Sequence, residues 1–291
     1  MRVTTRIAAL AAASALALAG CAGSPEPEAS APASTPAASG EATGGAPALQ
    51  TVTEGKLTIA TSDPAYEPWM VDNDPANGKG YESAVAYAVA AELGFGPEDV
   101  EWVRASFDQI IAPGVKNFDF AINQVSITEE RRSNIAFSSS YYDAAQAIVT
   151  IEGSAADGVT DVAGLRSLKI GAMVGTTSAT YAEEVIQPEQ QVSLFNDNEQ
   201  VKQALDAGLV DAVVFDLPTA LYVSAVELEG GTIIGQLPAG ENPDQFGLVL
   251  DLESPNVAAV TAAVDALREN GTLARLEAEW LTDAAGVPVL E

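Results

Sequence analysis

Apolar residues in this 291-residue chain switch repeatedly between the two-residue period of a strand and the 3.6-residue period of a helix. Strands are predicted at residues 56–60, 100–103, 118–122 and 145–151, and helices at 81–93 and 107–116. A second cycle has strands at 168–173, 192–195 and 212–215, and helices at 178–186, 198–207 and 218–226. Alternating strands and helices predict an α/β fold whose parallel sheets are covered on both faces. Two such cycles predict two lobes of similar build.

The end of the chain decides how the lobes are connected. One more strand is predicted at 246–250, followed by amphipathic helices at 256–269 and 272–281. If this segment returns to the first lobe, the chain crosses between the lobes twice, near 144–148 and near 240–246. We therefore expect lobe 1 to comprise residues 54–144 and 246–291, and lobe 2 residues 145–245. Two crossings form a hinge, and a hinge between α/β lobes creates a cleft.

The N-terminal 20 residues have the layout of a secretory signal peptide. Arg2 and Arg6 precede an apolar core at residues 7–19, which is too short to span a bilayer as a stable helix. The following Leu18-Ala19-Gly20-Cys21 run resembles a bacterial lipobox, which implies that the Cys21 thiol carries a diacylglycerol. We therefore expect a chain that is lipid-anchored on the extracytoplasmic face of the cell membrane. The alternative is an ordinary signal peptide whose cleavage region happens to contain a cysteine.

Residues 21–53 are expected to form a disordered linker behind the lipidated cysteine. They are dominated by Ala, Ser, Pro, Gly, Thr and Glu, a composition that cannot bury a core. Such a segment tethers a folded body of roughly 240 residues, enough for one large or two small domains.

Composition excludes several kinds of function. With 13 Lys and Arg against 41 Asp and Glu, the net charge is −28, which makes nucleic acid and anionic lipid surfaces poor partners. The chain contains no histidine, and Cys21 is its only cysteine. A Ser-His-Asp triad, a cysteine nucleophile in the body and the usual His/Cys zinc sites are therefore excluded. We expect no catalytic residue, no cofactor and no metal.

Several motifs stand in an order and spacing that is similar to one known family. They are Asp63-Pro-Ala-Tyr66-Glu-Pro68-Trp69, Gly80-Tyr-Glu82, Ser126-Ile-Thr128-Glu-Glu-Arg131 with Phe137-Ser138 and Tyr141, Gly175-Thr176-Thr177, and Asp211 with Asp216. The segment Glu269-Asn-Gly271 to Trp280 also resembles the family's C-terminal helix pair. Over residues 54–282, the chain resembles the polar amino-acid receptors of bacterial ABC importers, such as the histidine-binding and lysine/arginine/ornithine-binding proteins.

The resemblance implies a type 2 periplasmic-binding-protein clamshell. Its ligand would be a free amino acid, and its protein partners the permease and ATPase subunits of the importer. We expect a monomer that performs no catalytic step.

Arg131 is the candidate partner of a ligand carboxylate, because a planar guanidinium grips a carboxylate with two parallel hydrogen bonds. The alternative is a solvated arginine near a helix start, where Ser126 and Glu129 would form a capping box. Gly175-Thr176-Thr177 follows a strand and opens a helix, so backbone N–H groups at Thr176 and Thr177 would grip the same carboxylate from the second lobe. Alone, this tripeptide is no more than a turn and a cap.

Asp216 follows an apolar strand at its carboxyl end, where open α/β sheets place ligands. We expect it to pair with the α-ammonium group, although an Asp before Leu-Pro is equally typical of a helix N-cap. The resemblance adds Ser126, for both charged ends of the ligand, and Gln124 as a further contact of the ammonium.

The side-chain pocket is expected from residues that the family places around the substrate side chain. They are Asp63, Tyr66, Trp69 and Phe107. Asn123 is expected to reshape this pocket, because Asn123 and Gln124 replace small hydroxyl residues that the family often has before the Ser-Ile-Thr run. An acid beside aromatic faces favours a cationic or amide side chain. Asp63 before Pro64 could equally start a turn.

Two other functions stay open at this point. Cyclohexadienyl dehydratases use the same fold as enzymes on an anionic substrate, and a ligand sensor would use the same clamshell without a transporter. The pairing of Arg131 with Asp216 favours a zwitterion over a dicarboxylate.

Overall fold

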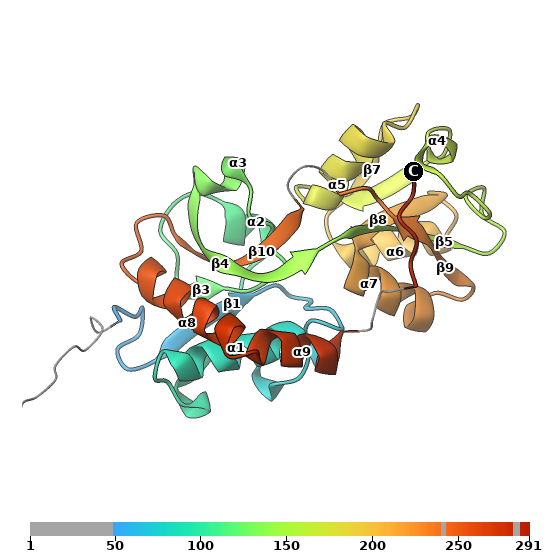
Figure 1. The fold of residues 1–291 in the computed structure, drawn as a ribbon. Coiled ribbons are helices and arrows are strands. Elements are labelled where there is room, and N and C mark those ends of the chain that lie inside the picture. Colours follow the sequence, from blue (N-terminus) through green and yellow to red (C-terminus); the bar gives the residue numbers. More distant parts are fainter. Residues whose placement is uncertain (1–48, 240–242, 282–285) are drawn as a thin grey trace, which may run out of the picture. The chain divides into compact units, whose positions relative to one another are not determined.

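The fold is built on two five-stranded sheets with the same strand arrangement (Figure 1). A computed structural model describes residues 49–239, 243–281 and 286–291, all within one compact unit, Gly45–Glu291. The first sheet has the order β2-β1-β3-β10-β4, and the second has the order β7-β6-β8-β5-β9. Each sheet with the helices packed on it forms one lobe.

The first sheet consists of β1 (Leu57–Thr61), β2 (Val100–Arg104), β3 (Phe120–Ala121), β4 (Ile135–Ala144) and β10 (Asp244–Asp251). Strands β2, β1 and β3 are parallel, whereas β10 is antiparallel to both β3 and β4. Helices α1 (Tyr81–Glu92), α8 (Val257–Glu269) and α9 (Thr272–Trp280) pack together beside this sheet (Figure 1).

The second sheet consists of β5 (Gln146–Ile151), β6 (Ile170–Met173), β7 (Ser193–Phe195), β8 (Ala212–Asp216) and β9 (Gly231–Gln236). Strands β7, β6 and β8 are parallel, and β5 is antiparallel to β8 and β9. Its helices are α4 (Val162–Leu165), α5 (Thr177–Tyr181), α6 (Asn198–Asp206) and α7 (Leu217–Tyr222). Helices α5 and α7 each continue as a π-helical turn, over Ala182–Ile186 and Val223–Glu227.

Alternating side chains fill an apolar core on both faces of each sheet. In the second sheet, Ile148 and Val214 face the core that contains α5, while their neighbours Val149 and Phe215 face the core that contains α6 and α7. This alternation follows from the two-residue repeat of a strand. The first lobe has aromatic side chains in its core, whereas Ala, Val, Ile and Leu dominate the cores of the second.

The expectation of purely parallel sheets was wrong in one respect. The antiparallel strand in each sheet is the one that arrives from the other lobe: β5 follows β4 directly, and β10 returns after β9. The sequence also gave no prediction of β4 or β9. The helix expected at 107–116 ends early, since α2 spans Phe107–Ile111 and is followed by Pro113 and Gly114, whose φ is +106°.

Both ends of the folded body differ from the expected boundaries. Gln50 and Val52, placed in the linker, hydrogen-bond to Asn256 and Asp119 of the first lobe. At the other end, residues 286–291 do not stay with the first lobe. Val289 pairs with Gln236 of β9, and Leu290 is 3% exposed in a core of the second lobe. The chain therefore crosses between the lobes a third time, after α9, whereas we expected two crossings.

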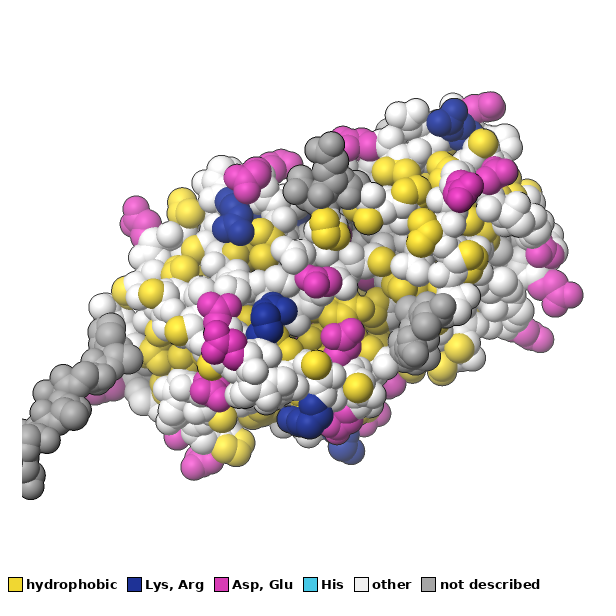
Figure 2. All heavy atoms as spheres, viewed as in Figure 1, with side chains coloured by type: hydrophobic (Ala, Val, Ile, Leu, Met, Phe, Trp, Pro, Cys, Tyr) yellow, Lys and Arg dark blue, Asp and Glu magenta, His cyan; other side chains and the backbone are white. Residues whose placement is uncertain are grey.

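Acidic side chains are spread over the face of the molecule shown in Figure 2, with Lys and Arg among them. Within the described residues, no helix combines the length and apolarity needed to cross a membrane. The predicted signal peptide, the lipidation site Cys21 and residues 21–48 of the linker lie outside the described residues.

Candidate ligand-binding cleft

A cavity of about 200 Å³ lies between the two lobes. Drug-sized ligands occupy pockets of about 300–1,000 Å³, so this cavity suits a smaller molecule. Its walls contain ten of the residues that the sequence placed in the site: Asp63, Tyr66, Phe107, Asn123, Gln124, Ser126, Arg131, Thr176, Thr177 and Asp216. Arg131 and Asp216 therefore share one cavity.

Arg131 is buried in the cavity wall and held from three directions. Helix α3 (Glu129–Arg132) carries it, and the cap of that helix is Thr128, whose hydroxyl accepts from the Arg131 backbone N–H. The alternative, a solvated arginine behind a capping box of Ser126 and Glu129, is therefore wrong. The guanidinium donates to the carbonyl oxygens of Ser126 (2.8 Å) and Gly175 (3.0 Å) and lies 5.3 Å from the ring centre of Phe107. A guanidinium has five N–H donors, so donors are left for a ligand.

Two interlobe contacts adjoin Arg131. The bond to Gly175 O crosses from the first lobe to the second, and Ser126 Oγ lies 3.1 Å from Thr177 Oγ1. Gly175 has a φ of +73°, which favours glycine, and Thr176 caps α5 by accepting from Ala179 N. The turn therefore presents Thr176 and Thr177 to the cavity, as expected from the sequence.

Asp216 stands at the carboxyl end of β8 on the second-lobe wall. Its Oδ1 accepts from Gln146 Nε2 at 2.6 Å. Asp216 is the N-cap residue of α7, as the alternative had it, but its carboxylate makes no capping hydrogen bond. Loss of solvent contact and repulsion by Asp244 raise the pKa of Asp216 to about 8, while the Gln146 hydrogen bond acts in the opposite direction.

Gln146 and Asp244 form a layer behind Asp216 that sequence reasoning missed. Gln146 is 1% exposed and begins β5, while Asp244 is 8% exposed and begins β10. Asp244 Oδ2 accepts from Thr177 Oγ1 (2.6 Å) and from Gln146 Nε2 (3.2 Å). Both residues open an apolar strand at a predicted crossing between the lobes. A polar residue at such a position is the signal that could have found them.

Gln124 lines the cavity, and its backbone is bound by the buried acid Glu82. Its φ is +45°, and its backbone N–H donates to Glu82 Oε1 at 2.7 Å. The Gln124 side-chain amide and the Tyr141 hydroxyl also donate to Glu82, which is 0% exposed. The backbone N–H and one side-chain amide hydrogen of Gln124 thus bind Glu82, which leaves its two carbonyl oxygens and the second amide hydrogen for a ligand. Burial raises the pKa of Glu82 to about 7 against these hydrogen bonds.

Asp63, Asn123 and Tyr66 approach the cavity from the first lobe. Asp63 is exposed, and its carboxylate accepts from Asn73 Nδ2 (3.0 Å). Asn123 Oδ1 accepts from Ser62 Oγ (2.9 Å). These contacts fix the orientation of two polar groups on one side of the cavity.

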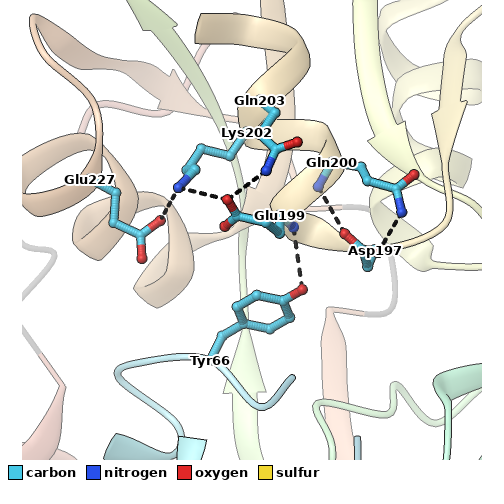
Figure 3. A network of polar contacts seen from close by, with 7 residues as sticks. All are labelled: Tyr66, Asp197, Glu199, Gln200, Lys202, Gln203 and Glu227. Atoms are coloured by element: carbon cyan, nitrogen blue, oxygen red, sulfur yellow. Dashed lines mark hydrogen bonds and ion pairs between the residues drawn. The ribbon is translucent and has the colours of Figure 1, made fainter. Parts of the chain in front are cut away.

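Tyr66 extends from its first-lobe loop to the N-terminus of α6 in the second lobe (Figure 3). Its hydroxyl oxygen accepts from the backbone N–H of Glu199 at 3.3 Å. Lys202 joins the Glu199 carboxylate (3.1 Å) to Glu227 (3.4 Å), and Asp197 caps α6 through Gln200. Burial raises the pKa of Tyr66 to about 12, so the phenol is neutral at pH 7.

Trp69 does not line the cavity, and its assignment to the side-chain pocket was wrong. It is 0% exposed and packs edge-on against Tyr81, Tyr142 and Phe246. Its indole N–H donates to Thr219 Oγ1 of α7 at 2.8 Å, which is a further bond between the lobes. Burial in the core stabilises a large aromatic ring, and the indole N–H has a hydrogen-bond partner there.

The model of one protein family, the bacterial extracellular solute-binding proteins of family 3, matches residues 57–283. This chain belongs to that family. The match covers both lobes and the cleft between them. The two-lobed architecture is the type 2 periplasmic-binding-protein fold, and the family serves amino-acid uptake by ABC importers.

Among curated relatives of this family 3 solute-binding protein is the L-arginine-binding protein of Pseudomonas aeruginosa. It is 27% identical over 233 residues, which is 75% of this chain and 85% of the relative. A solved ancestral arginine-binding protein bound to glutamine is 29% identical, with a TM-score of 0.66, and covers 78% of this chain and 98% of its own. Both relatives are binding proteins rather than enzymes.

One solved structure concerns the enzyme alternative. The ancestral amino acid-binding protein AncCDT-1, described as a precursor of cyclohexadienyl dehydratase, is 26% identical with a TM-score of 0.65. It covers 78% of this chain and 96% of its own. This solute-binding protein therefore shares its fold with a binding protein that is described as a precursor of an enzyme.

Proposed function

We propose that this solute-binding protein captures a free polar amino acid in the interlobe cleft and delivers it to the permease of an ABC importer. The observation that carries the proposal is that Arg131 and Asp216 line the same cavity from different lobes. An amino acid enters such a cleft as a zwitterion, and each buried charge costs several kcal/mol unless it meets a partner. Arg131 and Asp216 supply one partner for each charge.

In this proposal, Arg131 grips the ligand carboxylate with the backbone N–H groups of Thr176 and Thr177, and the Ser126 hydroxyl turns from Thr177 Oγ1 to donate to the same carboxylate. Asp216 accepts from the α-ammonium group, together with Ser126 and the carbonyl groups of Gln124. The Thr177 hydroxyl is already donating to Asp244, so we assign its backbone N–H rather than its side chain to the carboxylate.

The ligand side chain is proposed to lie beside Asp63, Tyr66, Phe107 and Asn123. An acid and aromatic faces favour a cationic or amide group. Asp63, Asp197 and Asp216 all line the cavity, and among the described lining residues Arg131 is the only Lys or Arg. This excess of acids supports a ligand of neutral or positive net charge. The name of the arginine-binding relative and the glutamine bound by the ancestral protein agree with these two side-chain classes.

Ligand binding would stabilise contact between the lobes. A ligand held by Arg131 on one lobe and by Asp216 on the other favours the state in which both touch it, by its differential affinity for that state. We propose that the permease recognises this state. In the proposed arrangement, Cys21 anchors the monomer to the outer face of the membrane through its lipid, and the segment that follows it is the tether.

The cleft does not favour a dehydratase. A dicarboxylate would prefer a second cation, whereas Asp216 stands opposite Arg131. An assay for phenylpyruvate formation from prephenate distinguishes the two functions, and we expect no product. Genes for a permease and an ATPase beside the gene for this protein would favour import over sensing.

A thermal-shift screen of the full-length chain against the twenty amino acids tests the proposal. A ligand that binds only the folded state raises the melting temperature. We expect a polar amino acid with a cationic or amide side chain to give the largest increase. Screening the matching 2-hydroxy acid in parallel controls for the ammonium group, because this analogue retains the carboxylate and side chain. No increase with any amino acid would contradict the proposal.

A further inference from the structure

Two aspartates share one amide behind the cleft wall. The amide nitrogen of Gln146 donates to Asp216 Oδ1 at 2.6 Å and to Asp244 Oδ2 at 3.2 Å. A glutamine amide has two hydrogens, so each carboxylate takes one. Gln146 is oriented by Ser178, whose hydroxyl donates to Gln146 Oε1 at 2.7 Å. The two carboxylates are therefore held as close neighbours by an oriented and almost fully buried side chain.

The negative charges of this pair have no directly paired cation. Among the described residues, no Lys or Arg forms an ion pair with Asp216 or Asp244. Arg131 acts electrostatically on both Asp216 and Asp244, but its guanidinium donates its hydrogen bonds to the carbonyl oxygens of Ser126 and Gly175. Two carboxylates that share a desolvated site cannot both ionise freely, so one proton is retained to a higher pH and belongs to the pair. The pKa of about 8 for Asp216 agrees with this geometry.

We propose that Asp216 and Asp244, bridged by Gln146, share one proton in the ligand-free protein and release it when an ammonium group binds at Asp216. Asp244 and Gln146 are then specificity-determining residues that touch no ligand themselves. The pair selects ligands with an ammonium group over equally shaped ligands without one.

The proton balance of the step is simple. Before binding, the protonated pair carries one negative charge. The ligand ammonium brings one positive charge to Asp216, and the shared proton leaves for solvent. Afterwards the pair carries two negative charges, one of which is paired directly with the ammonium. A 2-hydroxy acid brings no positive charge at this position, so the pair keeps its proton and this ligand can only accept or share hydrogen bonds.

The direction of the pH dependence follows from the groups that face Asp216. Asp244 on β10 and Glu82 on α1 oppose its ionisation, whereas Arg131 on α3 and the Gln146 amide favour it. Tyr142 on β4 also interacts electrostatically with Asp216. Burial raises the pKa of the Tyr142 phenol, so it is neutral at pH 7. Because binding expels a proton, affinity for an amino acid should rise with pH and level off near pH 8. The limiting slope is about tenfold in Kd per pH unit for one released proton.

The first test needs no ligand. Carboxyl carbons of the full-length chain are followed by NMR in samples labelled at aspartate, and Asp216→Asn and Asp244→Asn identify the two signals. We expect the pair to lose its last proton between pH 7 and 8 in the unmodified chain. In Asp244→Asn, the remaining Asp216 should titrate at lower pH. Two carboxylates that are both ionised at pH 6 in the unmodified chain would overturn the proposal.

The second test rests on the proposed function and uses L-arginine as the probe, or the best ligand from the thermal-shift screen. Titration calorimetry at pH 7 in two buffers of different ionisation enthalpy should show release of most of one proton. Between pH 6 and 8, Kd should fall about tenfold to fiftyfold, because the profile levels off as the pair loses its last proton. For the 2-hydroxy acid analogue, Kd should not fall over this range.

Two variants separate this proposal from a merely structural role of Asp244. Asp244→Asn should reduce the slope to less than twofold per pH unit and abolish most of the proton release. Asp251→Asn, at the other end of the same strand, is the matched control and should keep the slope of the unmodified chain. Binding with no proton release and a flat profile would overturn the shared proton while leaving amino-acid capture intact. Absence of any amino-acid ligand would overturn the proposed function, and the NMR titration would still decide the state of the pair.

Discussion

The two lobes have one sheet topology, but the only cation that lines the described cleft, Arg131, and the acid Asp216 come from different lobes. In each sheet, three parallel strands are followed by an antiparallel strand that arrives from the other lobe. The first lobe contributes Arg131 and the second contributes Asp216, and Asp244 lies near Asp216 at the start of β10, where the chain returns to the first lobe. Similar backbones thus support complementary chemistry. The difference lies in the few polar residues at strand ends and turns, which the sheet topology positions but does not specify.

The lobes also differ in how they are packed. The first is centred on a cluster that joins Trp69, Tyr81, Tyr142 and Phe246, whereas small aliphatic residues fill the second. The aromatic cluster reaches the second lobe through the indole N–H of Trp69. One lobe therefore contributes a bond from its core to the interlobe contact, in addition to the bonds at the cleft.

The largest effect is expected from removing the cation of the first lobe. Arg131→Ala would leave a buried ligand carboxylate without its partner, at a cost of about 3 to 5 kcal/mol. This corresponds to a Kd increase of about a hundredfold to several thousandfold, measured by calorimetry. Arg132→Ala is the matched control, because the neighbouring arginine is exposed and pairs with Glu129. Unchanged affinity in Arg131→Ala would show that the two walls do not play opposite roles.

A smaller effect is expected from the acid of the second lobe. Asp216→Asn keeps the shape of the side chain but removes the charge opposite the ammonium, at a cost of about 2 kcal/mol or about thirtyfold in Kd at pH 8. Asp211→Asn serves as the control, since this acid precedes the same strand and binds the backbone of Lys169. If both variants bound equally well, the anionic wall would lie elsewhere.

The bond between the aromatic core and the second lobe should contribute less. Trp69→Phe retains an aromatic ring but removes the donor to Thr219, which costs about 1 to 2 kcal/mol of folding free energy in urea unfolding. Trp102→Phe removes a longer bond to Tyr87 within the first lobe and should cost less. Adding Thr219→Val to Trp69→Phe should recover part of the loss. If the two substitutions changed the free energy of unfolding in a strictly additive way, the result would contradict a hydrogen bond between Trp69 and Thr219.

An effect on the pH dependence of folding stability, rather than on binding, is expected from the buried acid of the first lobe. Because the pKa of Glu82 is raised to about 7 in the folded protein, its contribution to stability is present at low pH and is lost as pH rises through 7. The glutamine in Glu82→Gln does not titrate. The urea midpoint of this variant should therefore rise relative to that of the unmodified chain from pH 5 to pH 8. Glu92→Gln, at the exposed end of the same helix, should show no such trend. An equal trend in both variants would contradict the buried acid as its source.

Much of the fold was predictable because apolar periodicity records which faces are buried. The strands around Ile59, Val149 and Val214 and the helix from Tyr81 were found within a residue or two. Strand direction was not, because periodicity is the same in parallel and antiparallel strands. Strand β4 was not predicted because Ser138, Ser139 and Ser140 interrupt its apolar residues.

The site was predictable where a residue type has few alternative uses. Asp216 was placed on a cleft wall because it follows the carboxyl end of a strand. Arg131 was placed there because a guanidinium binds a carboxylate with two hydrogen bonds and because the chain resembles the receptor family. Trp69 was misplaced because a sequence cannot tell an aromatic residue that lines a cavity from one that fills a core. Gln146 and Asp244 were missed because they are 98 positions apart in the chain and meet only when both crossings are built.

The most direct test of opposite charges on the two walls is a thermodynamic cycle between protein and ligand. Calorimetry would give Kd for the best amino acid and for the amine made from it by removing the carboxylate, each with the unmodified chain and with Arg131→Ala. If Arg131 grips the carboxylate, the variant should weaken amino-acid binding at least a hundredfold and change amine binding by less than about threefold. An equal loss for both ligands would contradict the account, because Arg131 would then act on something other than the carboxylate.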